Sequence, residues 1–87
     1  MIARKEGWLS ARVGDEIMMM SVDRGEYIGM NDVGARIWEL IETPSDVATI
    51  CAALLREFEV SPETCEAQVR SFVSEMEKHG TVTVYTI

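Results

Sequence analysis

Residues 26–40 read EYIGMNDVGARIWEL, and the hydrophobic period changes within this stretch. Before Asn31 the side chains alternate, as they do in a short β-strand. Asn31 is a favourable N-cap, and after it apolar residues recur at helical spacing, at Val33, Ile37, Leu40 and Ile41. The stretch therefore predicts a strand at 26–30 that leads directly into a helix at 32–42.

Two further strands are expected upstream of this junction. Residues 8–13 alternate apolar and polar side chains, which predicts a half-buried strand. Residues 16–22 form an almost continuous apolar run, which predicts a central strand contacted on both faces. Short turns at Gly14-Asp15 and Asp23-Arg24-Gly25 join the three strands, so we expect an antiparallel meander.

Downstream, the sequence predicts two more helices and an extended tail. Residues 46–58 carry an apolar stripe and begin at Ser45 or Asp46 as cap. Residues 62–79 follow the cap Ser61 and end at a glycine, and 81–87 alternate as a strand would. The expected fold is a single α+β domain over 1–87, winged-helix-like, with a three-stranded antiparallel β-meander followed by three α-helices.

Charge and hydropathy exclude several classes of partner. The 87 residues are 47% hydrophobic and carry a net charge of −7, which disfavours nucleic acid and anionic membranes. The third predicted helix carries four glutamates against only Arg70 and Lys78, so it would meet phosphates poorly as a recognition helix. No signal-peptide segment or membrane span is evident, and we expect a cytoplasmic protein.

The sequence contains no evident catalytic or metal-binding constellation. His79 is the only histidine, and Cys51 and Cys65 are expected to be small core residues in a reducing compartment. Met18 and Met20 could share a strand face as thioether ligands, but core packing explains them better. We therefore expect no enzyme activity, no cofactor and no metal.

The predicted strand at 26–30 lies at the end of the meander and should expose one edge. Such an edge beside a helix can capture an extended peptide, with the backbone supplying affinity and side-chain pockets supplying specificity. A merely solvated edge strand is the alternative.

The stretch at 26–40 also resembles the strand-to-helix segment of PqqD-like proteins. The resemblance rests on the aromatic-Gly-apolar-Asn junction followed by Val-Gly-x-x-Ile-Trp, and it covers roughly residues 8–82. It continues through Asp46-Val47-Ala48-Thr49-Ile50, Phe58-Glu59-Val60 and His79-Gly80-Thr81-Val82. These proteins are peptide-recognition domains of pathways that make ribosomally synthesised and post-translationally modified peptides.

The resemblance implies a non-catalytic domain that binds a precursor leader peptide and presents it to a maturation enzyme. In the family the leader adds to the third strand, and its side chains enter a cleft against the third helix. Carried over, the peptide-binding residues are Glu26, Tyr27, Ile28, Gly29 and Met30 on the strand, and Glu66, Val69, Arg70, Val73 and Glu77 on the helix. Ile28, Met30, Val69 and Val73 could alternatively belong only to the core.

Within the family, a stand-alone chain of this length resembles the leader-binding protein of lasso-peptide pathways, which works beside a separate leader peptidase and a cyclase. It is also similar to the pyrroloquinoline-quinone chaperone that serves a radical enzyme. A winged-helix regulator or a different protein-interaction module is the remaining alternative.

The tail at 81–87 lacks charged side chains and has the composition of a strand. We expect it either to fray or to occupy the free edge at 26–30, in the same molecule or in a weak homodimer.

Overall fold

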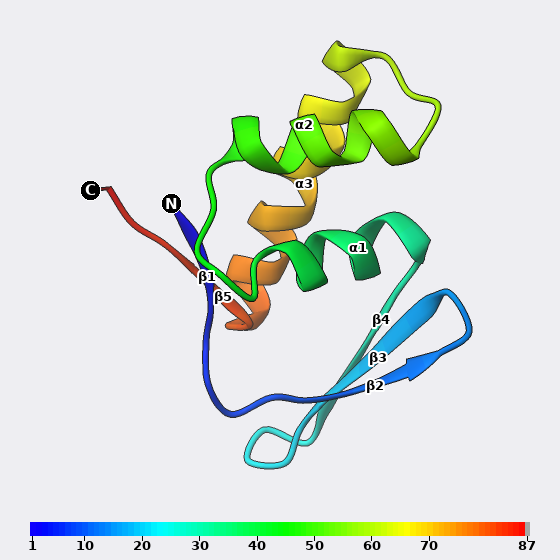
Figure 1. The fold of residues 1–87 in the computed structure, drawn as a ribbon. Coiled ribbons are helices and arrows are strands. Elements are labelled where there is room, and N and C mark those ends of the chain that lie inside the picture. The colour runs from blue at the N-terminus through cyan, green and yellow to red at the C-terminus, as the bar shows by residue number, and fades with distance from the viewer. Residues whose placement is uncertain (87) are drawn as a thin grey trace.

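A computed structural model describes residues 1–86. Three helices pack beside a three-stranded sheet and a separate two-stranded ribbon (Figure 1). The elements in chain order are β1 (Ile2–Arg4), β2 (Leu9–Val13), β3 (Glu16–Ser21), β4 (Glu26–Met30), α1 (Asp32–Leu40), α2 (Val47–Glu57), α3 (Pro62–His79) and β5 (Val82–Val84). The α+β class, the meander and the order of the three helices are thus confirmed.

The meander has the strand order β2-β3-β4, with both pairs antiparallel. Its burial differs from the prediction. All five residues of β2 are exposed rather than half-buried, and β3 buries one face only, since Ile17, Met19 and Ser21 are covered while Met18 is exposed. The helices pack against a single face of the sheet, so the apolar run in β3 does not mark a strand covered on both faces.

The helix termini follow the predicted caps. The side chains of Asn31, Asp46 and Ser61 accept hydrogen bonds from the third residue beyond them, which satisfies backbone N–H groups that lack helical partners. α3 ends at Gly80, whose φ of 77° lies in the left-handed region. α1 ends at Leu40, two residues before the predicted end.

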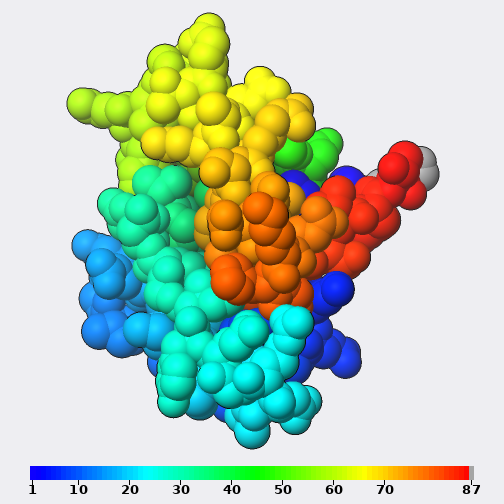
Figure 2. All heavy atoms as spheres, turned by 180° about the vertical axis from the view of Figure 1, so that it is seen from behind, coloured from blue at the N-terminus to red at the C-terminus, as the bar shows by residue number. Residues whose placement is uncertain are grey.

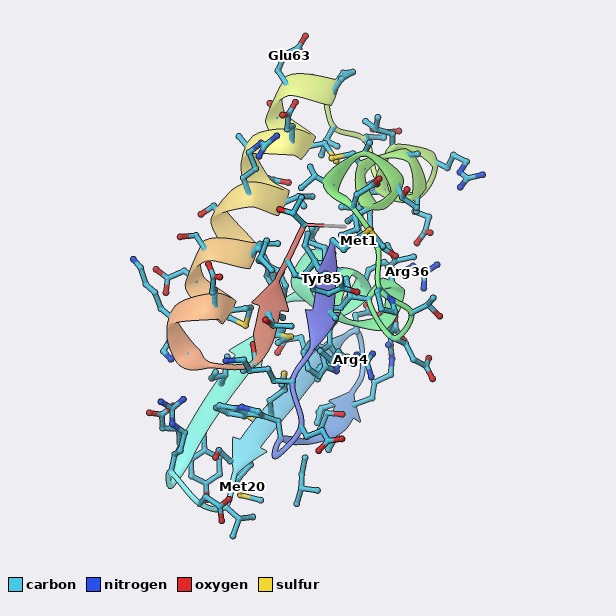
Figure 3. The ribbon with its side chains drawn as sticks, turned by 90° about the vertical axis from the view of Figure 1, so that its left-hand side faces the viewer. Met1, Arg4, Met20, Arg36, Glu63 and Tyr85 are labelled. Carbon is cyan, nitrogen blue, oxygen red and sulfur yellow. The ribbon has the colours of Figure 1, made fainter. Side chains whose placement is uncertain are left out.

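The tail does not occupy the edge of β4. Its central part forms β5 and pairs antiparallel with β1, a strand that the sequence analysis did not predict. Figure 3 shows the two strands side by side, with Met1 near Tyr85; the Met1 amino group donates to the Tyr85 carbonyl oxygen at 2.7 Å. Thr81 and Val82 are fully buried, so this part of the tail belongs to the core. Residue 87 lies outside the described residues.

The core lies where the covered face of the sheet meets all three helices. Met19 from β3, Ile37 from α1, Leu54 from α2 and Val69 from α3 are at most 1% exposed. Arg4 covers one side of this core, with its guanidinium 4.4 Å from the ring centroid of Trp38. None of the helices in residues 1–86 combines the length and apolar character that crossing a membrane requires.

Candidate functional site

β4 forms one edge of the meander, and the register identifies which of its backbone groups are free. The two-residue turn between Val13 and Glu16 makes that pair a hydrogen-bonded one, and hydrogen-bonded and non-hydrogen-bonded pairs alternate along antiparallel strands. Residues 17, 19 and 21 therefore bond to β4, through their partners at 30, 28 and 26. It follows that Tyr27 and Gly29 direct their N–H and C=O groups to the open edge.

The side chains of β4 divide between the two faces of the sheet. Ile28 and Met30 are buried against the helices, whereas Tyr27 is 72% exposed on the opposite face. Glu26 also faces the helices, and its Oε2 is buried without a hydrogen-bond partner among the described residues. The edge at the predicted peptide-binding strand is thus formed by backbone groups of Tyr27 and Gly29, with Glu26 at its start.

Two adjoining hollows of about 240 and 310 Å³ lie beside this edge, between the β4–α1 junction and α3. We call them the Phe72 groove; Asn31, Gly34, Ser71 and Phe72 line both hollows, and Gln68, Glu75 and Met76 extend the lining along α3. Figure 2 shows this side of the molecule, with α3 in yellow to orange beside the cyan and teal of β4 and α1.

The floor of the Phe72 groove depends on Gly34. A Cβ atom at Gly34 would lie 3.0 Å from Cε2 of Phe72, so a larger residue would displace the ring. Gly34 also donates its N–H to Oδ1 of the cap residue Asn31 at 2.9 Å. The glycine at position 34 therefore leaves room for Phe72 of α3 beside the start of α1.

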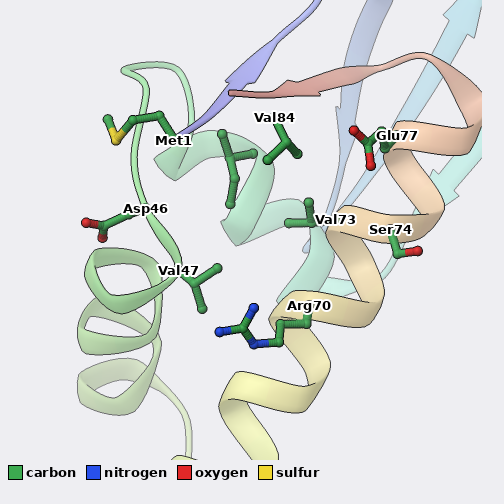
Figure 4. Close-up of a pocket in the computed structure, with 9 residues that line it drawn as sticks. Met1, Asp46, Val47, Arg70, Val73, Ser74, Glu77 and Val84 are labelled. Atoms are coloured by element: carbon green, nitrogen blue, oxygen red, sulfur yellow. The ribbon is translucent and has the colours of Figure 1, made fainter. Parts of the chain in front are cut away.

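The residues predicted on α3 do not line this groove. Val69 is fully buried, and Glu66 is exposed and pairs with Arg70 at 2.9 Å. Arg70, Val73 and Glu77 line a different hollow of about 380 Å³, the Val73 pocket, whose other walls include Val47 of α2 and Val84 of β5 (Figure 4). The structure thus brings Glu26 to Met30 together along one edge, but it places the predicted helix residues on another side of α3.

The sequence analysis missed the α3 residues that line the Phe72 groove, namely Gln68, Ser71, Phe72, Glu75 and Met76. The sequence signal that could have found them is Gly34, since a glycine in the first turn of α1 indicates a close approach by another element.

Neither cysteine is poised as a nucleophile. Burial, followed by the neighbouring Cys65 thiol, raises the pKa of Cys51 to about 11, so its thiolate is scarce at neutral pH. Both cysteines are free, with Cys65 buried and Cys51 half-buried. Within residues 1–86 no group of His, Cys, Asp and Glu side chains is arranged to hold a metal ion.

Solved structures of two other proteins have closely similar folds. TbiB1, whose structure is a complex with the TbiA(beta) leader peptide, is 27% identical, with a TM-score of 0.86 over 98% of this chain and 99% of that one. A lasso peptide synthetase B1, complexed with the leader peptide, is 19% identical, with a TM-score of 0.84 over 95% and 98% of the two chains. The latter likeness concerns the fold alone.

A comparison with curated proteins found no match. The family described as coenzyme PQQ synthesis protein D (PqqD) matches residues 16–82, which include the meander from β3 onward, all three helices and the first residue of β5. The match spans the free edge of β4 and the Phe72 groove, and it extends over well more than half of the sequence. This chain therefore belongs to the PqqD family.

Proposed function

We propose that this chain binds the leader segment of a ribosomally made precursor peptide as an added strand on β4. The observation that carries the proposal is the open edge formed by Tyr27 and Gly29 directly beside the Phe72 groove. These two residues offer two donors and two acceptors, and each hydrogen bond contributes about 1 kcal/mol net. Backbone pairing alone would thus supply about 4 kcal/mol, independently of the peptide sequence.

Specificity would come from alternate leader side chains. In a strand added to β4, every second side chain points to the helix-covered side of the sheet, where the Phe72 groove lies. The half-buried Phe72 and the buried Met76 favour apolar leader residues there, and Glu75 favours a basic one at the rim. Of the predicted residues, Glu26 to Met30 remain in this proposed site.

The bound leader would be presented to a maturation enzyme, and this chain would act without catalysis and without a cofactor. The likeness to TbiB1, a leader-peptide complex, over nearly the full length of both chains supports leader binding. The first candidate pathway is of the lasso type, in which a leader peptidase and a cyclase act on the precursor. The name of the matched family supports a second candidate, a peptide chaperone for the radical enzyme of pyrroloquinoline-quinone synthesis. The two candidates differ in the precursor that binds.

Titration of the chain with synthetic leader peptides tests the proposal. The probes are the leader of the precursor encoded beside this gene, the TbiA(beta) leader, a scrambled peptide and a DNA duplex at two salt concentrations. We expect saturable binding of the chain's own leader and none of the scrambled peptide. Saturable binding of the duplex with no binding of any leader would instead favour a winged-helix regulator.

A matched pair of substitutions locates the peptide on α3. Glu75 lines the Phe72 groove and Glu77 lines the Val73 pocket, and the two lie about 200° apart around the helix. Both are exposed, so either can be replaced by tryptophan without disturbing the core. Glu75→Trp should weaken leader binding about tenfold or more, while Glu77→Trp should leave it within about twofold. The reverse result would place the leader against Arg70, Val73 and Glu77, as the sequence analysis predicted.

A further inference from the structure

The face of the meander that points away from the helices is apolar and uncovered. Four large apolar side chains on this face are about half exposed or more: Leu9 (60%), Val13 (68%), Met18 (47%) and Tyr27 (72%). In Figure 1 the helices lie on the other side of β2, β3 and β4. Large side chains of this kind cost free energy in water, so a contiguous group of them indicates a contact surface.

The register shows that these side chains are contiguous. Leu9, Met20 and Tyr27 form one row across the three strands, and Ala11, Met18 and Gly29 form the next. Val13 extends the surface at the end of β2, opposite Glu16. We call the group of Leu9, Ala11, Val13, Met18, Met20, Tyr27 and Gly29 the outer sheet face. Glu16 points to the same side at the margin of this group, because it lies directly opposite Val13, and the outer sheet face itself carries no charge in a chain of which 26% is charged.

The charges around the outer sheet face argue against a second copy as its occupant. The exposed fractions correspond to an apolar area on the order of 500 Å², near the upper end for soluble monomers. Exposed acids lie at both ends of this face, Asp15 and Glu16 at one end and Asp23 at the other, and the chain carries a net charge of −7. Two copies pairing through this face would bring like charges together, which disfavours a dimer.

A strand bound to β4 would enlarge this surface. If the proposed function holds, the leader becomes a fourth strand of the same sheet. Every second leader side chain then enters the Phe72 groove, and the others point to the same side of the sheet as Tyr27. Two or three such side chains would extend the apolar surface by one strand. The completed surface would then exist only when the leader is bound.

We propose that the outer sheet face, continued by the bound leader, is the docking surface for the enzyme that processes the precursor. This inference rests on the proposed leader binding and adds the place where the enzyme contacts the chain. The enzyme's matching surface is apolar with a basic rim, because Asp15 and Glu16 at one end of the sheet and Asp23 at the other are exposed acids. An enzyme docked in this way would discriminate the loaded chain from the empty one.

The test uses the purified full chain, its synthetic leader and the purified maturation protease encoded in the same gene cluster. Val13→Lys and Leu9→Lys place a charge on the outer sheet face, on the strand farthest from β4. Ser10→Lys is the matched control, because Ser10 is exposed on the same strand and its side chain points to the other face. Calorimetric titration measures the leader and the protease separately, and sedimentation measures self-association.

We expect the protease to bind the leader-loaded chain at least about tenfold more tightly than the empty chain. Val13→Lys and Leu9→Lys should weaken that binding about tenfold, with the dissociation constant of the leader unchanged within about twofold, and Ser10→Lys should change neither. Unaltered protease binding by both variants, or an equal loss with Ser10→Lys, would overturn the inference. So would a free-chain dimer that Val13→Lys dissociates. Absence of leader binding by the unsubstituted chain would instead refute the proposed function.

Discussion

Replacing Gly29 with proline tests whether backbone pairing at β4 holds the leader. Gly29 directs its N–H to the open edge rather than to β3, so proline removes a donor that the folded protein does not use. The lost hydrogen bond costs about 1 kcal/mol of binding free energy. The leader carbonyl that would have accepted it stays without a partner, which costs about 1–3 kcal/mol more. A total of about 2–4 kcal/mol corresponds to a loss of affinity of about 30-fold to 800-fold.

Gly29→Ala is the control, because it retains the N–H. A Cβ at this position would meet only the Met18 Cε atom at 3.8 Å, an ordinary contact, so alanine fits without rearrangement. Fluorescence anisotropy with a labelled leader gives the dissociation constants, and circular dichroism with thermal melting verifies that each variant is folded. A folded Gly29→Pro protein that binds the leader as tightly as Gly29→Ala would refute the reasoning.

Three further expectations concern charge, thiol chemistry and the tail. A leader carrying Lys or Arg should associate more slowly in stopped flow as salt is raised, because Glu26 at the start of the β4 edge and Glu75 at the Phe72 groove attract it. An association rate that does not change with salt would exclude this steering. Cys51, with its pKa raised to about 11, should react with iodoacetamide at pH 8 much more slowly in the native protein than in urea. The contribution of the Cys51 thiol to the free energy of unfolding should decline as pH rises from about 9 through about 11. Deleting residues 82–87 should lower the melting temperature, because Val82 is fully buried. An unchanged melting temperature would contradict the observed packing of β5, and so would a tighter leader complex without loss of stability.

Local signals explain why the strands and helices of the meander and bundle could be predicted. The Asn31, Asp46 and Ser61 caps, the turn glycines and the apolar periods each act over a few residues, and the observed element bounds lie within about two residues of those predictions. The Ile2–Arg4 strand escaped prediction because it is three residues long and pairs with β5, nearly 80 residues away. Such a pairing leaves no periodic pattern in the short segment itself.

The orientation of α3 about its axis was the decisive quantity that the sequence could not supply. Val69 and Val73 share one stripe of α3 with Glu66, Arg70 and Glu77. The resemblance to PqqD-like proteins therefore implied all five together as peptide-binding residues. Which flank of that stripe faces β4 depends on how the helices pack, and on the flank that does so Phe72 lies against Gly34. The strand half of the candidate site needed no such information, because edge position and alternation follow from the order of the hairpins.

The two proposals assign different tasks to the two faces of one added strand. Side chains alternate across a strand, so a leader on β4 gives every second residue to the Phe72 groove and the others to the side of Tyr27. Substitutions of the first set should then alter affinity for this chain, and substitutions of the second set should alter only engagement by the enzyme. An alanine scan along the leader is read out by chain binding and, at chain concentrations that saturate every leader variant, by protease cleavage. The effects should therefore alternate between the two assays with a period of two residues. A scan in which both assays lose signal at the same positions would mean that one face of the leader performs both tasks.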